Sequence, residues 1–273
     1  MTEAVNVDNL TYIFPETETP SLLNIDLSVP WNTRTLVIGC NGAGKSTLLK
    51  LLSGKHLCLN GKVKVSGTDP FSPMAMGQNT DECQLTTYLG TEWCHMEIIH
   101  RDIGVMELLE SIGLKYYQER GNLLCSILEV DLNWRMHKLS DGQKRRVQLV
   151  MGLLKPWRVL LLDEVTVDLD VVGRSRLLDF LKIETSTRRC SVIYATHIFD
   201  GLAQWPNKIV HLRQGRIVSD INYDRDVEFQ NRVDAQDGNG TVIKDHDGKI
   251  IISKVSSLHP LALHWLNNDL DQH

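Results

Sequence analysis

Gly39-Cys-Asn-Gly-Ala-Gly-Lys-Ser46 is the stretch that decides how this chain of 273 residues folds. It fits the pattern G-x-x-x-x-G-K-[ST] at every fixed position. The glycines let the backbone curl so that successive N–H groups point inward and form a cradle for phosphate oxygens. Residues 35–38 before it are short and apolar, and residues 48–52 after it have helical character. The sequence therefore predicts a buried strand, a phosphate loop and a helix.

The residue types in this loop predict a magnesium-bound nucleoside triphosphate as its ligand. Lys45 is suited to bridge the β- and γ-phosphates, and the Ser46 hydroxyl is suited to bind Mg²⁺. The helix that follows adds the positive end of its dipole. The residues expected to bind the nucleotide here are Gly39, Asn41, Gly42, Ala43, Gly44, Lys45, Ser46 and Thr47.

A second short apolar strand, residues 159–162, ends in Asp163-Glu164. Asp163 at the strand tip can hold Mg²⁺, directly or through water. Glu164 is suited to polarise an attacking water as a general base. The alternative is a strand followed by a solvated acidic turn. The order of the two patterns along the chain favours a metal-dependent nucleotide hydrolase.

Leu139-Ser-Asp-Gly-Gln143 resembles the signature sequence LSGGQ of the ATP-binding cassette (ABC) ATPase family. The resemblance implies that Ser140, Gly142 and Gln143 bind the γ-phosphate of an ATP held by the opposite subunit. Ser140 is also a good N-cap, and a helix beginning at 141–142 presents free N–H groups to an anion. The alternative is that Ser140 and Asp141 only cap that helix.

Further segments are similar to the rest of the family's set, in the family's order. Residues 166–170 are similar to its D-loop, and Thr196-His197 is similar to its switch histidine. The resemblance implies that Lys45, Glu164 and His197 are catalytic, with ATP and Mg²⁺ as cofactors. Phe14 lies where the family places an aromatic residue that stacks on adenine, and Tyr12 is the second candidate.

The sequence departs from the family pattern at four places. Cys40 replaces the usual proline, Asp141 replaces a glycine, and Val167-Asp168 replaces a pair of small residues. The glutamine of the family's Q-loop is absent: the sequence there is Gly90-Thr-Glu-Trp-Cys94, so Thr91 or Glu92 takes its place. In transporters this loop couples nucleotide state to the membrane domain, so its loss favours a protein outside the usual transporters.

The resemblance implies an α/β fold: a P-loop NTPase core of ABC type, with a RecA-like parallel sheet, antiparallel strands and an inserted helical subdomain. Strand and helix patterns alternate along the chain, as a mainly parallel sheet requires. Residues 242–253 predict a hairpin around Asp247-Gly248, and residues 259–268 a helix. The expected parts are 1–82 and 157–222 for the core, 83–156 for the helical subdomain with the signature, and 223–273 for a C-terminal extension.

Composition limits the partners. The formal net charge is −5, which gives no strong attraction to nucleic acid, so no direct nucleic-acid binding is predicted. The six cysteines have neither the spacing of a zinc finger nor the density of a disulfide framework. No segment supplies the roughly 20 mostly apolar residues of a transmembrane helix. We therefore expect an intracellular protein, and the family resemblance described next implies the cytoplasm, with the nucleus as a further location.

Three longer blocks, residues 91–105, 139–170 and 194–203, resemble a soluble, non-transporter group of fungal ABC ATPases associated with the carbon catabolite repressor–NOT transcription complex. The resemblance implies an ATP-dependent head-to-tail homodimer that regulates a transcription or messenger-RNA complex, with subunits of that complex as partners. One alternative is the separate nucleotide-binding subunit of an ABC transporter. The other is a scaffold that senses nucleotide without turnover.

Overall fold

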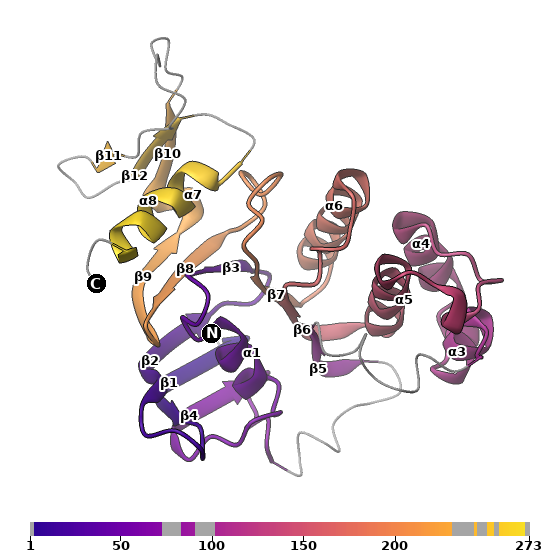
Figure 1. Cartoon of the computed structure of the whole chain (residues 1–273), viewed down its shortest axis with the longest axis horizontal. Helices are drawn as coiled ribbons and strands as arrows, with labels where there is room; N and C mark the ends of the chain where they lie inside the picture. Colours follow the sequence, from indigo (N-terminus) through magenta and orange to yellow (C-terminus); the bar gives the residue numbers. More distant parts are fainter. Residues whose placement is uncertain are drawn as a thin grey trace.

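The computed structural model describes residues 3–72, 83–90, 102–230, 243–244, 250–253 and 257–270. These residues form a six-stranded sheet, a three-stranded antiparallel sheet, a small C-terminal sheet and a group of helices (Figure 1). The α/β fold with parallel and antiparallel strands that the sequence predicts is confirmed.

The six-stranded sheet has the order β5-β6-β7-β3-β8-β9. Its first five strands run parallel, and β9 runs antiparallel to β8. Every residue of β3 and β7 is buried, which explains why apolar residues follow one another without alternation in Leu36–Ile38 of β3 and Val192–Ala195 of β7. The strands are β3 (Arg34–Ile38), β5 (Gln84–Leu89), β6 (Trp157–Asp163), β7 (Ser191–Ala195), β8 (Lys208–Arg213) and β9 (Arg216–Asn222).

The antiparallel sheet has the order β2-β1-β4 and contributes to a core together with helix α1 (Lys45–Leu52). Figure 1 shows α1 beside these strands. In β2 buried residues alternate with exposed ones from Ile25 to Val29, as expected for a strand with one face on the core. The strands are β1 (Val5–Ile13), β2 (Pro20–Val29) and β4 (Asn60–Val65).

The helices of the predicted insertion gather beyond β5 and β6 (Figure 1). They are α3 (Val105–Ser111), α4 (Gln118–Leu128) and α5 (Asp141–Leu154), with 3-10 turns at Leu114–Tyr116 and Met136–Lys138. Strand β5 falls inside the range 83–156 but lies in the six-stranded sheet, because it pairs with β6 from Gln84 to Leu89. The helical part therefore follows β5, and the division of the chain into four parts stays a prediction.

Helix α6 (Val171–Thr187) precedes β7, and the C-terminal part follows β9. That part holds α7 (Tyr223–Asp226), β10 (Val227–Gln230), β11 (Ile243–Lys244), β12 (Ile250–Ser253) and α8 (His259–Leu270). Strands β11 and β12 are antiparallel, as the predicted hairpin requires, and its Asp247-Gly248 turn lies outside the described residues. The sequence did not predict that β10 pairs in parallel with β12.

Candidate functional site

The phosphate loop connects β3 to α1, and two of its glycines adopt left-handed backbone angles, with φ of 80° at Gly42 and 101° at Gly44. Other residue types rarely adopt these angles. Space is also short: a Cβ on Gly39 would lie 2.3 Å from the Leu212 carbonyl oxygen, and one on Gly44 would lie 2.7 Å from Leu22 Cδ2. The sequence pattern is therefore required by this backbone path.

The Lys45 ammonium is buried inside the loop. It donates to the carbonyl oxygens of Gly39 at 2.7 Å and Cys40 at 3.0 Å. Burial lowers the pKa of Lys45, and the carboxylates of Glu164 and Asp163 act in the opposite direction. The fold thus brings the lysine of the loop and the two acids that end β6 into one electrostatic environment.

Asp163 is held by two hydroxyl groups. Ser46 Oγ donates to its Oδ1 at 2.9 Å, and the Tyr88 hydroxyl donates to its Oδ2 at 2.9 Å. Ser46 and Asp163 are the two predicted magnesium ligands, and the fold brings them together from positions 117 residues apart. A hydroxyl and a carboxylate oxygen fit Mg²⁺, which in nucleotide sites takes one or two protein oxygens in addition to phosphate and water. Within the described residues no group of three or more His, Cys, Asp or Glu side chains could hold a metal.

Glu164 and His197 come together because their strands, β6 and β7, are neighbours in the sheet. The Nδ1 atom of His197 lies 2.9 Å from Glu164 Oε2, and the backbone N–H of His197 donates to the same oxygen at 3.3 Å. Glu164 has a φ of 54°, which is uncommon for a residue with a side chain and is often found at functional sites. Two of the three predicted catalytic side chains, those of Glu164 and His197, thus form a pair.

The signature residues lie at the exposed N-terminus of α5. Ser140 caps this helix in a capping box: its Oγ accepts from Gln143 N at 3.3 Å, and Gln143 Oε1 accepts from Ser140 N at 3.0 Å. The side chain of Asp141 is 85% exposed and lies 3.4 Å from Lys144 Nζ. The predicted cap is therefore present, and the Asp141 carboxylate is turned toward a lysine.

A hollow of about 560 Å³ opens beside this helix end. Arg146 stands in it and pairs with Glu129 at 3.1 Å and with Asp170 at 2.6 Å. Asp170 in turn caps α6 by accepting from Gly173 N, which connects the helical part to the segment after β6. The lining residues are Glu129, Trp134, Ser140, Gly142, Gln143, Arg146 and Asp168.

Phe14 lies in a cluster of rings. Its ring meets Tyr12 edge-on, with centroids 5.0 Å apart, and His56 at 5.7 Å. His56 follows the C-terminal end of α1, so both candidates for adenine stacking, Phe14 and Tyr12, contact the segment that follows this helix. Thr47 on that helix is joined to β2 through Ser21, with 3.2 Å between the hydroxyl oxygens.

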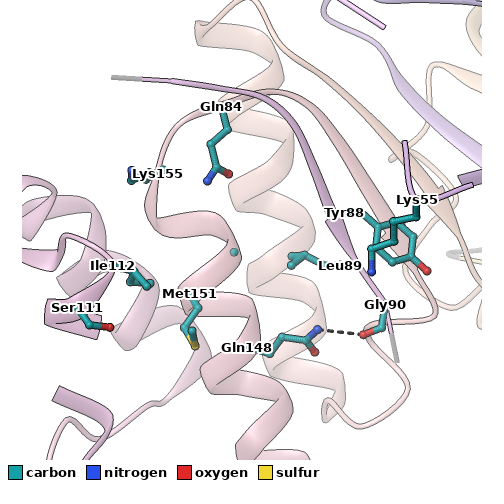
Figure 2. A pocket seen from close by; sticks show the side chains of 11 residues that line it. Lys55, Gln84, Tyr88, Leu89, Gly90, Ser111, Ile112, Gln148, Met151 and Lys155 are labelled. Carbon is teal, nitrogen blue, oxygen red and sulfur yellow. Dashed lines mark hydrogen bonds between the residues drawn. The ribbon is translucent and has the colours of Figure 1, made fainter. Parts of the chain in front are cut away.

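A second hollow, of about 710 Å³, lies at the end of β5 (Figure 2). Lys55, Tyr88 and Gly90 stand on one side of it, and Gln148 and Met151 of α5 reach it from another. The proposed Q-loop residues, Thr91 and Glu92, follow directly and lie outside the described residues. The hollow therefore lies where the end of β5 meets the signature helix.

Sequence reasoning missed two residues near the loop, Tyr88 and Asp269. Tyr88 reaches Asp163 only because β5 pairs with β6 in register, which no motif in the sequence indicates. Asp269 on α8 lies 3.0 Å from His211 Nε2 and 3.9 Å from the sulfur of Cys40 in the phosphate loop. The C-terminal extension thus contacts the loop from a position 229 residues away.

Comparison with known proteins identifies the family. A family model described as ABC transporter matches residues 22–167. The chain is 63% identical to CCR4-associated factor 16 of Saccharomyces cerevisiae, over 97% of this chain and 95% of that protein. It is 42% identical to ABC transporter I family member 20 of Arabidopsis thaliana, over 74% of this chain and 62% of that protein. Member 21 of the same plant group is 39% identical, over 78% of this chain and 76% of that protein.

Solved structures share the fold. An ATP-binding subunit of an ABC transporter has a TM-score of 0.68 at 21% identity, covering 82% of this chain and 91% of that one. A dimeric ATP-binding cassette bound to ADP and phosphate has a TM-score of 0.64 at 19% identity. The match covers 80% of this chain and 98% of that one. Among the described residues, no helix has the length and apolar character needed to cross a bilayer. The matched family model and the yeast relative, covered over 95% of its length, confirm the prediction from the motifs: the chain belongs to the ABC family and is an ATP hydrolase of that family.

Proposed function

We propose that this chain binds and hydrolyses Mg·ATP between two copies of itself, paired head to tail. The observation that carries the proposal is the exposed, capped N-terminus of α5, whose Ser140 is on the surface. In Figure 1 the helix after the phosphate loop, α1, and the signature helix, α5, lie in separate parts of the molecule. One chain could therefore supply the loop and a second chain the signature for each ATP, and a two-fold axis would complete two equal sites.

The residues of the loop supply binding and charge. Lys45 contacts the β- and γ-phosphates in this proposal, and the glycine-rich backbone holds their oxygens. The Ser46 hydroxyl and the Asp163 carboxylate, already 2.9 Å apart, would hold Mg²⁺. When bound, this ion neutralises charge on the phosphates and on the leaving ADP.

Glu164 and His197 act on the water molecule that attacks the γ-phosphate. The Glu164 carboxylate takes a proton as the water oxygen bonds to the γ-phosphorus and the bond to ADP breaks. His197 holds that carboxylate through the 2.9 Å contact with its Oε2, and in this proposal it also contacts the γ-phosphate when ATP is bound. Ser140, Gly142 and Gln143 of the second chain bind the γ-phosphate through the free N–H groups of α5.

The relative in yeast supports a regulatory role. That protein is named for association with CCR4. The match covers 97% of this chain and 95% of the yeast protein. We propose that this chain likewise joins subunits of the carbon catabolite repressor–NOT complex, in the cytoplasm and the nucleus. ATP binding would close the dimer and hydrolysis would release it. The nucleotide state would therefore determine which surface of this protein is exposed to the subunits of the repressor complex.

Sedimentation of the Glu164→Gln variant tests the dimer. This variant lacks the base but keeps the loop, so we expect a monomer without nucleotide and a dimer with Mg·ATP. The matched variant Glu164→Gln with Ser140→Ala should stay largely monomeric. A monomer in both conditions for Glu164→Gln contradicts the proposal.

Affinity capture with the Glu164→Gln form, with and without ATP, tests the regulatory role. We expect ATP to change the recovery of subunits of the repressor complex. Recovery of an integral membrane protein in their place would support the transporter alternative.

A further inference from the structure

The Tyr88 hydroxyl group reaches a carboxylate on the next strand. It donates to Asp163 Oδ2 at 2.9 Å, while Ser46 donates to Oδ1 of the same carboxylate. Asp163 is only 6% exposed, so its charge depends on such donors. The two bonds fix the carboxylate from both sides and determine which oxygen faces Ser46.

Gly90 makes room for the phenol. A Cβ at position 90 would lie 2.6 Å from the Tyr88 hydroxyl oxygen and 2.9 Å from the nearest ring carbons. The Gly90 carbonyl accepts from Gln148 Nε2 at 2.9 Å (Figure 2). It also accepts from Arg145 Nη1 at 2.8 Å, so α5 fixes its place. The phenol therefore lies across a glycine that the signature helix holds.

Lys55 fixes the other side of the ring. Its Nζ lies 4.6 Å from the centroid of the Tyr88 ring, within the range of a cation–π interaction. Figure 2 shows the lysine side chain beside the ring. The phenol is thus held by Lys55, Gly90 and Asp163, which come from three separate segments.

We infer that Tyr88 is a positioning residue of the ATPase site: its hydroxyl orients Asp163 so that Oδ1 stays directed to Ser46, where Mg²⁺ would bind. The inference rests on the proposed metal-binding role of Asp163 and Ser46. Without the hydroxyl, Oδ2 loses its donor and the carboxylate is free to rotate. The affinity for Mg²⁺ would then fall, because binding the ion would also have to fix the orientation of Asp163 Oδ1, which costs entropy.

The Tyr88→Phe variant removes the hydroxyl and keeps the ring over Lys55. Binding of a fluorescent ATP analogue is measured at increasing Mg²⁺, so the readout is independent of turnover. A hydrogen bond to a charged group is strong enough that we expect half-saturation at about tenfold higher Mg²⁺. Binding of the analogue in EDTA should be unchanged. Tyr116→Phe, at an exposed tyrosine, is the matched control and should behave as the wild type.

The Gly90→Ala variant tests the same contact with the hydroxyl intact. The new methyl group pushes the phenol away from Asp163, so we expect the same direction of change, and little further change when Tyr88→Phe is added. Gly104→Ala is its control, because a Cβ there meets only Glu107 atoms at 3.8 Å or more.

The outcomes separate the inference from the function on which it rests. If Asp163→Asn leaves the Mg²⁺ dependence of binding unchanged, the proposed metal role is wrong. If Asp163→Asn shifts it and Tyr88→Phe does not, the inference is overturned. It is also overturned if Tyr88→Phe weakens binding equally in EDTA, because the residue would then support the loop and not the metal ligand.

Discussion

The phosphate loop and the signature segment take their hydrogen-bond partners from different distances along the chain. Ser46 of the loop bonds to Asp163, 117 residues away, and Cys40 contacts Asp269, 229 residues away. In the signature segment Ser140 bonds to Gln143, three residues away, and Asp141 pairs with Lys144 in the same turn. The loop is thus built by the whole fold, whereas the signature is a local structure presented at the surface.

This difference has a physical consequence for mutations. A change in the loop disturbs contacts among several strands and helices, so binding and chemistry should both suffer. A change in the signature disturbs one helix end, so the folded chain should remain nearly intact while any role toward a second copy is lost. The predictions below test this distinction.

The largest effect is expected for Lys45→Ala. The buried ammonium is the cation of the loop, and removing a preorganised donor to a transition-state charge typically costs at least about 100-fold in rate. Phosphate release should fall to background, and circular dichroism should show a folded chain. Turnover within tenfold of the wild type would mean that another cation serves the phosphates.

Ser140→Ala should separate folding from association. Loss of an N-cap of this kind costs about 1 kcal/mol, so the Tm should fall by only about 2–4 °C for a chain of this size. The Mg·ATP-dependent dimer of the Glu164→Gln background should be lost in sedimentation. A Tm drop much larger than that would show that the signature end is as strongly connected to the fold as the loop is.

His211 should make the loop side of the molecule sensitive to acid. Burial lowers its pKa below the usual 6.5, although the contact with Asp269 acts in the opposite direction and Arg213, also near Asp269, lowers the pKa. The unfolded chain therefore takes up a proton at higher pH than the folded chain. Stability is fully present above the unfolded pKa and decreases as the pH falls toward the folded one.

Thermal unfolding at about pH 7.5 and pH 5.5 tests this effect of His211 on stability. His211→Gln removes the titrating group and keeps a donor for Asp269, so its Tm should fall less between the two pH values than that of the wild type. An equal fall in both proteins would place the acid sensitivity elsewhere.

The smallest effect is expected for Asp141→Asn. The Asp141 carboxylate is 85% exposed, so solvent screens its pair with Lys144, and the free energy of unfolding should change by less than about 0.5 kcal/mol. Removing one negative charge near a bound triphosphate should tighten the ATP-dependent dimer about fivefold, since a solvated charge pair is worth on the order of 1 kcal/mol. Weaker dimerisation would indicate that Asp141 makes a contact with the second copy.

Much of this arrangement could be predicted from the sequence, because local patterns carry it. The loop glycines, the apolar run before Asp163 and the cap at Ser140 each require a particular backbone within a few residues, and each was found there. The pairing of Glu164 with His197 follows from neighbouring parallel strands. The contacts that the sequence did not predict depend on the register between neighbouring strands and on the packing of the C-terminal helix against the phosphate loop. Tyr88 on β5 reaches Asp163 at the end of the neighbouring strand β6, and α8 reaches the loop from the far end of the chain.

The docking of α8 decides how the protein should be handled. Trp265 stacks on the His211 ring at 4.7 Å, and Asp269, 5% exposed, lies between that imidazole and Cys40. A shortened chain that stops before residue 257 would expose His211 to solvent and remove the carboxylate that contacts the Cys40 thiol of the phosphate loop. For crystallisation or enzyme assays, affinity handles therefore belong at the amino end, and the last helix should be kept.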